Sequence, residues 1–219
     1  MATTPGTPAG DGPTTRQAGP ASSRRPRYHH GELRTALIEA TFELLREVGL
    51  TGFSVAELAR RLGVSTAAPY RHFAHRDELL AAVATRAARE LTTAMRTAAD
   101  AAPADPVERF AATAGAYVTF VTDRGAGLDI IFAAELRHLH DRDLADAGRE
   151  LNNLLLDLAV QAVNGGPAQA LLLIESHIAI AQGYSTLNAN GFLEQARHTT
   201  GAVAERASRA SAALVRGQR

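Results

Sequence analysis

Histidine is the first residue of this chain to consider for chemistry, because imidazole serves as a metal ligand and as a general base. Two close pairs stand toward the N-terminus, His29-His30 and His72-x-x-His75. Neither pair has acids or cysteines at ligand spacing, so contact with phosphate or solvent explains them better than a metal ion does. We therefore predict no metal site.

His177 stands apart from these pairs, in an apolar stretch from Leu171 to Ile180. Two interpretations remain open at this point. The ring is either a hydrogen-bonded core residue or a polar group in the wall of a pocket.

No arrangement of residues supports catalysis. The chain has no cysteine, which excludes a thiolate nucleophile, a thiolate metal site and a disulfide scaffold. It also lacks the G-x-S-x-G pattern of serine hydrolases and a glycine-rich phosphate loop. We predict that the protein is not an enzyme and needs no cofactor.

The charges are balanced overall but unevenly placed. The 219 residues include 23 basic and 23 acidic side chains, and every basic one is arginine. Up to Arg76 there are 10 arginines against 6 acids, and from Asp77 onward there are 13 against 17. A basic N-terminal part beside an acidic remainder is compatible with nucleic-acid binding, whatever the total.

The chain has no membrane or export signal that we recognise. No apolar run reaches the ~20 residues of a transmembrane helix, and none at the start resembles a signal peptide. We expect a cytoplasmic protein without a membrane partner. Residues 1–26 are rich in Thr, Pro, Gly, Ala and Ser, which predicts a disordered tail. The arginines at its end, Arg24, Arg25 and Arg27, fit non-specific DNA contact and a passive extension equally well.

Apolar residues recur every three or four positions, which predicts an all-α fold of about nine helices and no strands. Leu33, Leu37, Leu44 and Val48 define the first helix, which Gly49 stops. The later helices are expected at residues 76–101, 106–122, 128–139, from Asp141 or Asp143 to 163, 168–188 and 192–215.

Two short helices between these have the spacing of a helix-turn-helix. Ser54 followed by Glu57 forms a capping box for a helix over 55–62, and Gly63 ends it. Ser65 is expected to cap a second segment that reaches Phe73. By spacing alone, an ordinary helical hairpin also fits.

The amino-acid sequence of these segments resembles that of the DNA-binding domain of the TetR/AcrR family of repressors. The remainder of the chain is similar to that family in length and helix count. The resemblance rests on Tyr28-His29-His30-Gly31, Ser54-Val55-Ala56-Glu57-Leu58-Ala59, Gly63-Val64-Ser65, Tyr70-Arg71-His72-Phe73 and Asp77-Glu78-Leu79-Leu80.

The resemblance implies that the second short helix enters the major groove with its N-terminal end first. Arg76 stands where the family usually has lysine, and Pro69 lies inside the recognition segment, so we expect a short, rigid recognition helix. Phe73 is expected to pack inside the domain. The DNA-contacting residues implied are Tyr28, His29, Ser54, Ser65, Thr66, Ala67, Ala68, Tyr70, Arg71, His72 and Arg76.

Three parts are therefore expected: a tail over 1–26, a DNA-binding domain over 27–75, and a regulatory and dimerisation domain over 76–219. The resemblance implies an effector pocket in the last part, mostly apolar with a few hydrogen-bonding groups. For each pocket residue, a place in the core fits equally well. The candidates are Met95, Phe110, Tyr117, Phe120, Ile131, Phe132, Leu136, Asn152, Leu155, His177, Gln182 and Tyr184.

The resemblance also implies a homodimer through a four-helix bundle, two helices coming from each chain. The alternative is that the last two helices pack only within one chain. The candidate seam consists of Leu171, Ile174, Ile178, Ala181, Leu187, Val203, Ala207, Ala210 and Leu214.

These expectations combine into a ligand-responsive repressor that leaves a palindromic operator when a small, mostly apolar effector binds. One alternative is an activator, or a regulator without an effector. A helical small-molecule-binding protein or enzyme that uses the hairpin as scaffold is another, and a helical interaction protein is a third.

Overall fold

The computed structural model describes residues 1–3, 30–125, 128–163, 165–193 and 199–218. Most of the predicted tail, together with Tyr28 and His29, lies outside these residues. Within them the protein is all-α, as predicted, with eight α-helices, two 3-10 helices and no strand. The α-helices are α1 His30–Gly52, α2 Val55–Arg61, α3 Arg76–Ala101, α4 Pro106–Arg124, α5 Leu128–Ile131, α6 Arg142–Ala162, α7 Pro167–Ala189 and α8 Thr200–Gly217; the 3-10 helices are η1 Pro69–Arg71 and η2 Ala134–Leu139.

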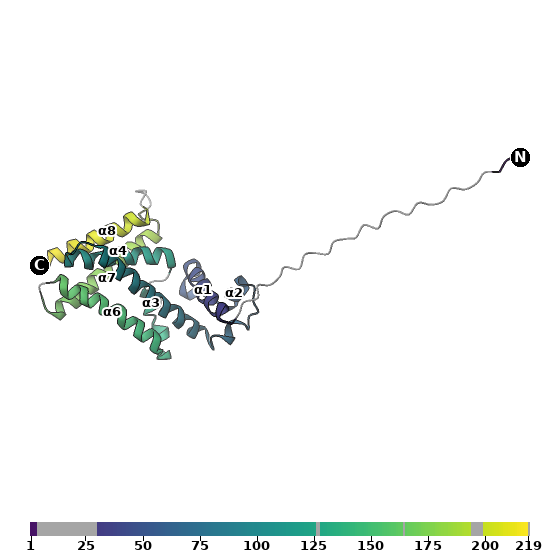
Figure 1. Cartoon of the computed structure of the whole chain (residues 1–219), viewed down its shortest axis with the longest axis horizontal. Helices are drawn as coiled ribbons and strands as arrows, with labels where there is room; N and C mark the ends of the chain where they lie inside the picture. The colour runs from purple at the N-terminus through teal and green to yellow at the C-terminus, as the bar shows by residue number, and fades with distance from the viewer. Residues whose placement is uncertain (4–29, 126–127, 164, 194–198, 219) are drawn as a thin grey trace.

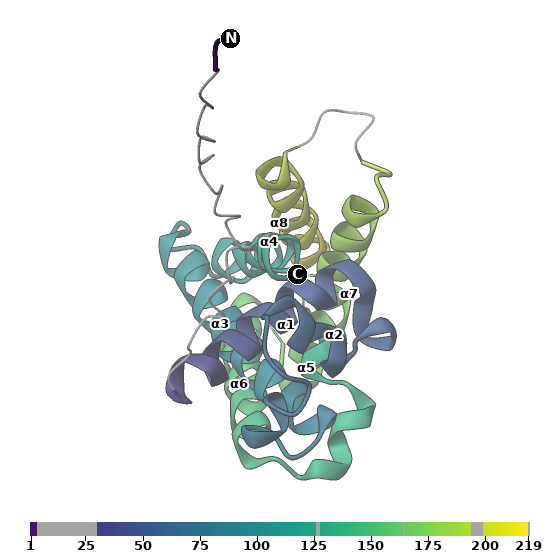
Figure 2. The same cartoon turned by 90° about the vertical axis from the view of Figure 1, so that its right-hand side faces the viewer.

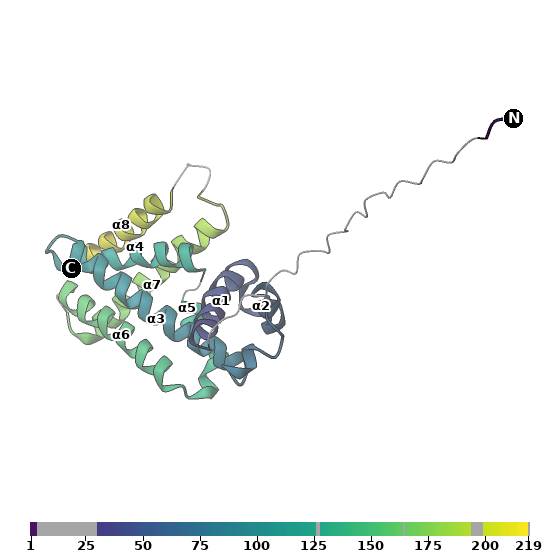
Figure 3. The ribbon, with the colours of Figure 1, turned by 45° about the vertical axis from the view of Figure 1, so that its right-hand side comes forward.

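The short helix α2 packs with α1 at one end of the molecule (Figure 1). From this end the long helix α3 runs into a bundle formed by α4, α6, α7 and α8 (Figure 3). Viewed from the α1 end, α3 and α6 lie to the left and α7 to the right (Figure 2). The helix α3 is therefore the element that the two ends of the molecule share.

Most helix boundaries follow from the caps that the sequence predicts. The Asp105 carboxylate accepts a hydrogen bond from the Val107 amide at 3.2 Å, and Pro106 opens α4. Of the two residues that could begin α6, Asp141 and Asp143, the cap is Asp141, whose carboxylate accepts a hydrogen bond from the Leu144 amide at 2.9 Å. The predicted stop at Gly49 also holds, because the backbone leaves the helical conformation there with φ 66°.

Two predicted helices differ in the structure. The single helix expected over 128–139 is divided into α5 and η2, with 3-10-type bonds from Ala133 to Ile130 and from Leu136 to Ala133. The last helix begins at Thr200 instead of 192, because Thr199 supplies the cap by accepting from the Ala202 amide at 3.3 Å.

The buried residues form one continuous hydrophobic cluster from α1 to α8. One member of the predicted apolar face of the first helix lies outside it, because Val48 is 44% exposed. The helix α4 has its most extensive contacts with α8. Gly115 permits this approach, since a Cβ there would lie 2.5 Å from Ser208 Oγ and 2.9 Å from the Ala204 carbonyl oxygen.

None of the helices in the described part of the chain is long and apolar enough to cross a membrane.

Candidate nucleic-acid interface and ligand cavity

The turn between α2 and the recognition segment has the geometry of a helix-turn-helix. Gly63 takes a left-handed φ of 66°, which a residue without Cβ adopts freely. The Val64 amide then donates to the Ala59 carbonyl at 3.0 Å. Leu58 and Ala59 are fully buried beneath the turn, so the small Ala59 lets the two segments approach.

Only half of the predicted capping box forms at the start of α2. The Ser54 hydroxyl accepts from the Glu57 amide at 3.5 Å, but the Glu57 carboxylate turns to Arg60 and Arg61 instead of returning to Ser54. Hydrogen bonds from these two arginines lower the pKa of Glu57 to about 2. The acid therefore stays ionised and holds both cations.

The recognition segment is not the α-helix that the sequence predicted. It is a turn after Ser65 followed by the single 3-10 turn of η1. Pro69 explains the difference, because it has no amide hydrogen to donate to the Ser65 carbonyl four residues earlier. The Ala68 amide donates to that carbonyl instead, at 2.9 Å, which is the shorter 3-10 spacing.

The predicted DNA-contacting residues in this segment lie mostly at the surface. Tyr70 is 52% exposed, an unusual position for a large aromatic ring, while Phe73 is buried as predicted. Exposed residues are Ser54, Ser65, Thr66, Ala67, Tyr70 and Arg71, and partly exposed ones are Ala68, His72 and Arg76.

Arg71 differs from the neighbouring arginines in its charge environment. Arg61 pairs with Glu47 at 2.6 Å and with Glu57 at 3.1 Å, and Arg60 pairs with Glu57 at 2.7 Å. Arg71 has no acidic partner among the residues that the structure describes. A bound anion would therefore meet Arg71 without displacing a carboxylate.

Arg76 is turned away from this surface. Its Nη2 donates to the Leu50 carbonyl at 2.9 Å and its Nη1 lies 3.3 Å from Asp77. The guanidinium carbon stands 5.6 Å from the centre of the Phe53 ring. In this structure the side chain ties the end of α1 to the start of α3, whereas the sequence suggested a phosphate contact.

A cavity of about 650 Å³ opens between α5, η2 and the first half of α6. It brings together four of the twelve predicted pocket residues: Ile131, Phe132, Leu136 and Asn152. Sequence reasoning missed the polar rim; its signal was the charged run Asp141-Arg142-Asp143 at the start of α6. The other lining residues are Ala133, His140, Asp141, Arg142, Leu144, Ala145, Asp146, Gly148 and Arg149.

The remaining predicted pocket residues do not line this cavity. Phe120 instead borders a groove between α3 and α4, and the Tyr117 hydroxyl donates to Gln182. Tyr184 is partly buried against the core. Met95, Phe110, Tyr117, Leu155 and His177 are all buried.

His177 is a hydrogen-bonded core residue, the first of its two interpretations. The Thr113 hydroxyl gives its hydrogen to the Phe110 carbonyl at 2.7 Å, so it accepts from His177 Nε2 at 2.9 Å. Nδ1 then accepts from the Ser211 hydroxyl at 2.7 Å. The ring is thus neutral and joins α4, α7 and α8. Burial lowers its pKa to about 4, because a charged imidazolium at this position would have no contact with water to stabilise its charge.

The predicted dimer seam divides into two sets. Ala181, Val203 and Ala207 are buried within the chain, while Ile174, Ile178, Ala210 and Leu214 are partly buried. Leu171 and Leu187 are 54% and 39% exposed.

The exposed part of this seam belongs to α7, which carries leucines on its exposed side as well as on its buried side. On α7, Leu173 faces the core, whereas Leu171 and Leu172, the latter missed by the sequence argument, are exposed. Adjacent exposed leucines form the kind of apolar surface that another molecule often covers. The outer face of α7 is therefore a candidate surface for contact with another chain.

Comparison with known proteins agrees with this architecture. The family model described as bacterial regulatory proteins of the tetR family matches residues 37–83. Those residues run from the middle of α1 through the helix-turn-helix into α3. No curated protein matches the chain.

Solved structures match over nearly the whole chain. A protein with unknown function from Rhodococcus sp. RHA1 is 31% identical, with a TM-score of 0.67 over 87% of this chain and 97% of that one. A tetR-family transcriptional regulator from Streptomyces coelicolor is 21% identical, with a TM-score of 0.57 over 83% and 81%. The TetR family transcriptional regulator PfmR from Thermus thermophilus is 19% identical, with a TM-score of 0.60 over 84% and 98%.

Proposed function

The chain belongs to the TetR family of transcriptional regulators, and we propose that it is a homodimeric repressor that a small effector releases from a palindromic operator. The observation that carries this proposal is the exposed recognition segment with an arginine that has no acidic partner among the described residues. Members of this family are generally not enzymes, and we propose no reaction.

Each residue of the proposed interface has a distinct chemical role. Arg71 offers two parallel donors to a guanine edge or a phosphate. The Thr66 hydroxyl and the methyl group of Ala67 suit base edges, including the methyl group of thymine. Tyr70 and Ser54 offer hydroxyls for phosphates, which fix position without reading sequence.

The proposed dimer joins the exposed faces of α7 from two chains, with α8 beside them. Burying Leu171 and Leu172 there removes apolar surface from water, which stabilises association. Two recognition segments in one dimer then meet half-sites about one helical turn of DNA apart. Because the recognition segment lies before Arg76, whereas α7 and the cavity lie after it, we propose that residues 27–75 act as the DNA-binding part and residues 76–219 as the regulatory part.

The proposed effector site is the 650 Å³ cavity, whose size is in the range of small-molecule pockets. Its apolar wall and charged rim suit a mostly apolar molecule with a polar group. The wall includes η2, and His138 of η2 lies 3.7 Å from the Asp77 carboxylate at the start of α3. A ligand that shifts η2 therefore acts next to the Arg76 contact with Leu50.

Fluorescence anisotropy with the DNA upstream of the protein's own gene tests the DNA-binding part of this proposal. The expected result is saturable binding whose log affinity falls linearly with log salt concentration, because phosphate contacts release counterions. Unrelated DNA of equal length and composition is the control. Equal affinity for both duplexes at physiological salt contradicts a specific operator.

A further inference from the structure

Arg124, the last residue of α4, contacts two other helices at once. Its Nε and Nη2 donate to the Glu90 carboxylate of α3 at 2.8 and 2.7 Å. Its Nη1 donates to Glu39 of α1 at 3.0 Å. The guanidinium carbon also lies 5.1 Å from the centre of the Phe42 ring, again on α1. One side chain thus joins the bundle to the helix that supports the recognition segment.

Arg86 completes a ring of alternating charges. It pairs with Glu90 at 2.8 Å and also with Glu39, so each carboxylate faces two guanidinium groups. We call Glu39, Arg86, Glu90 and Arg124 the interdomain charge cluster. Partial burial lowers the pKa of Arg124, but both glutamates outweigh that effect and the net shift is upward.

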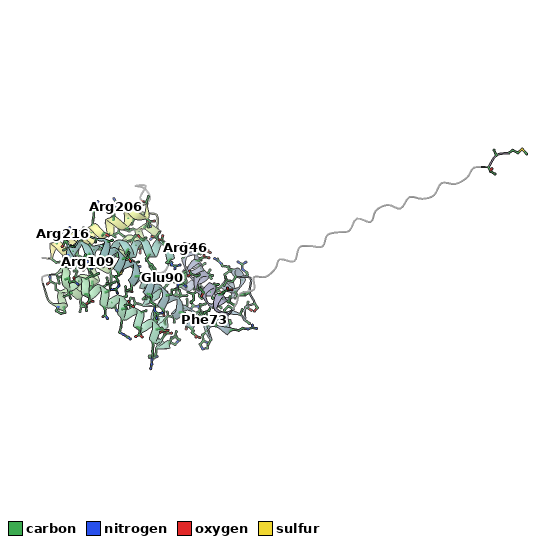
Figure 4. The ribbon with its side chains drawn as sticks, viewed as in Figure 1. Arg46, Phe73, Glu90, Arg109, Arg206 and Arg216 are labelled. Carbon is green, nitrogen blue, oxygen red and sulfur yellow. The ribbon has the colours of Figure 1, made fainter. Side chains whose placement is uncertain are left out.

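The backbone next to Arg124 is also held against α1. Gly125 ends α4 in the left-handed conformation with φ 65°. A Cβ at this position would collide with the Cβ of Arg46, so the two segments are in direct contact. Arg46 Nη1 donates to the Asp123 carbonyl at 3.3 Å. In Figure 4, Arg46 and Glu90 lie where the bundle meets the α1 end of the molecule.

We propose that Arg124 is a positioning residue for DNA recognition. It fixes the angle between α1 and the bundle, and with it the separation of the two recognition segments in the dimer. This inference rests on the proposed function, because separation matters only to a dimer on a two-part operator.

The chemistry of arginine supports this assignment. An isolated surface ion pair contributes little, but a bidentate arginine within a network of charges contributes more. A planar guanidinium binds two carboxylates and covers an aromatic ring at the same time, whereas an ammonium is a point charge. Lysine at position 124 is therefore expected to keep the charge and lose most of the positioning.

The first test measures geometry without DNA. The chain has no cysteine, so spin labels on Thr66→Cys and Thr119→Cys, both exposed positions, report the distance from the recognition segment to α4. Labelled chains are diluted with unlabelled protein so that each dimer carries one labelled pair. The full chain is expected to give one narrow distance distribution, and Arg124→Lys and Glu39→Gln are expected to broaden it.

The control variant is Arg109→Ala on the same helix. Arg109 pairs with Asp100 at 2.9 Å and donates to the Ala99 carbonyl, at the end of the bundle away from α1 (Figure 4). The Arg109→Ala variant loses a surface ion pair, as the Arg124 variant does, but it is expected to leave the distance distribution narrow. Distributions equally narrow in Arg124→Lys and in the unsubstituted chain overturn the positioning role.

The second test measures recognition. Operators selected by the unsubstituted protein are remade with one base pair added or removed between the half-sites. The unsubstituted protein is expected to prefer the original spacing by about tenfold, and Arg124→Lys to retain only about threefold, in the range of typical coupling effects. An equal loss of affinity at all spacings indicates a merely structural residue and overturns the inference. Failure to bind any duplex refutes the proposed function alone, because the distance measurement still decides the position of α1.

Discussion

Protonation of His177 would perturb the core of the helical bundle where α4, α7 and α8 meet. The neutral ring is buried between Phe110, whose ring centre is 4.2 Å away, and two hydroxyl groups. Protonating Nδ1 turns an acceptor into a donor beside the Ser211 hydroxyl, which must then rotate. The described contacts place no carboxylate against the ring, so the added charge has no compensating partner there.

The magnitude follows from two pKa values. The ring has a pKa of about 4 in the folded chain against an ordinary 6.5, which corresponds to about 3 kcal/mol. Between pH 6.5 and pH 4, His177 binds a proton in the unfolded chain but stays neutral in the folded chain. The free energy of unfolding is therefore expected to fall by about 1.4 kcal/mol per pH unit between pH 6.5 and 4 from this residue alone, and the contribution is fully present above pH 6.5.

Urea unfolding at fixed protein concentration, repeated from about pH 7.5 to about pH 4, measures this slope. His177→Gln is the reference, because it keeps a donor for Thr113 and removes the titration. The difference in stability between the two chains is expected to shrink by about 3 kcal/mol over this range as pH falls. Parallel curves would refute the claim that the folded protein holds this ring neutral.

Three further predictions concern packing, association and the cavity. Gly115→Ala is expected to destabilise the chain by about 1–3 kcal/mol in thermal unfolding, since α4 and α8 must separate, whereas Gly201→Ala, which meets only an atom at 3.9 Å, is expected to have little effect. Leu172→Glu is expected to yield monomers in sedimentation velocity, while Val48→Glu, also an exposed apolar residue, leaves the dimer intact; a dimeric Leu172→Glu contradicts the α7 interface. Gly148→Leu is expected to occupy part of the 650 Å³ cavity and weaken binding of the dye 1-anilinonaphthalene-8-sulfonate without loss of DNA affinity; unchanged dye binding would place the ligand site elsewhere.

The helical framework could be predicted because its signals are local. The Asp105 cap and the proline after it set the start of α4, and Gly63 sets the turn of the helix-turn-helix. The bounds of α3 agree with the prediction at both ends. Each of these signals acts within one helical turn, so no tertiary information is needed.

The errors arise where packing or a missing donor outweighs periodicity. Pro69 leaves no amide for an α-helical bond, so the recognition segment becomes a 3-10 turn. Ile131 and Leu136 are both buried in one core, although their spacing of five residues would place them on different sides of a continuous helix; the break between α5 and η2 brings both inward. Arg76 pairs with a carbonyl 26 residues earlier, a contact that no local pattern contains.

Most residues of the candidate pocket could not be predicted for the same reason, because the pocket depends on contacts between separate helices. Apolar residues such as Phe110 and Phe132 look alike in the sequence, but Phe110 is buried in the core whereas Phe132 is 43% exposed and lines the cavity. The difference depends on how α5, η2 and α6 meet, which is a property of tertiary packing. The interdomain charge cluster escaped notice for the same reason, because Glu39 and Arg124 are 85 positions apart.

The central claim is that the recognition segment reads an operator through Arg71. The direct measurement is selection from a random-sequence duplex library by the full chain and by Arg71→Ala, with Arg209→Ala on α8 as an exposed control. The account predicts a palindromic site for the unsubstituted protein and for Arg209→Ala. For Arg71→Ala it predicts relaxed preference at one symmetric base pair, with a loss of about 1–3 kcal/mol in binding free energy at that site. An identical site with undiminished affinity for Arg71→Ala would contradict it.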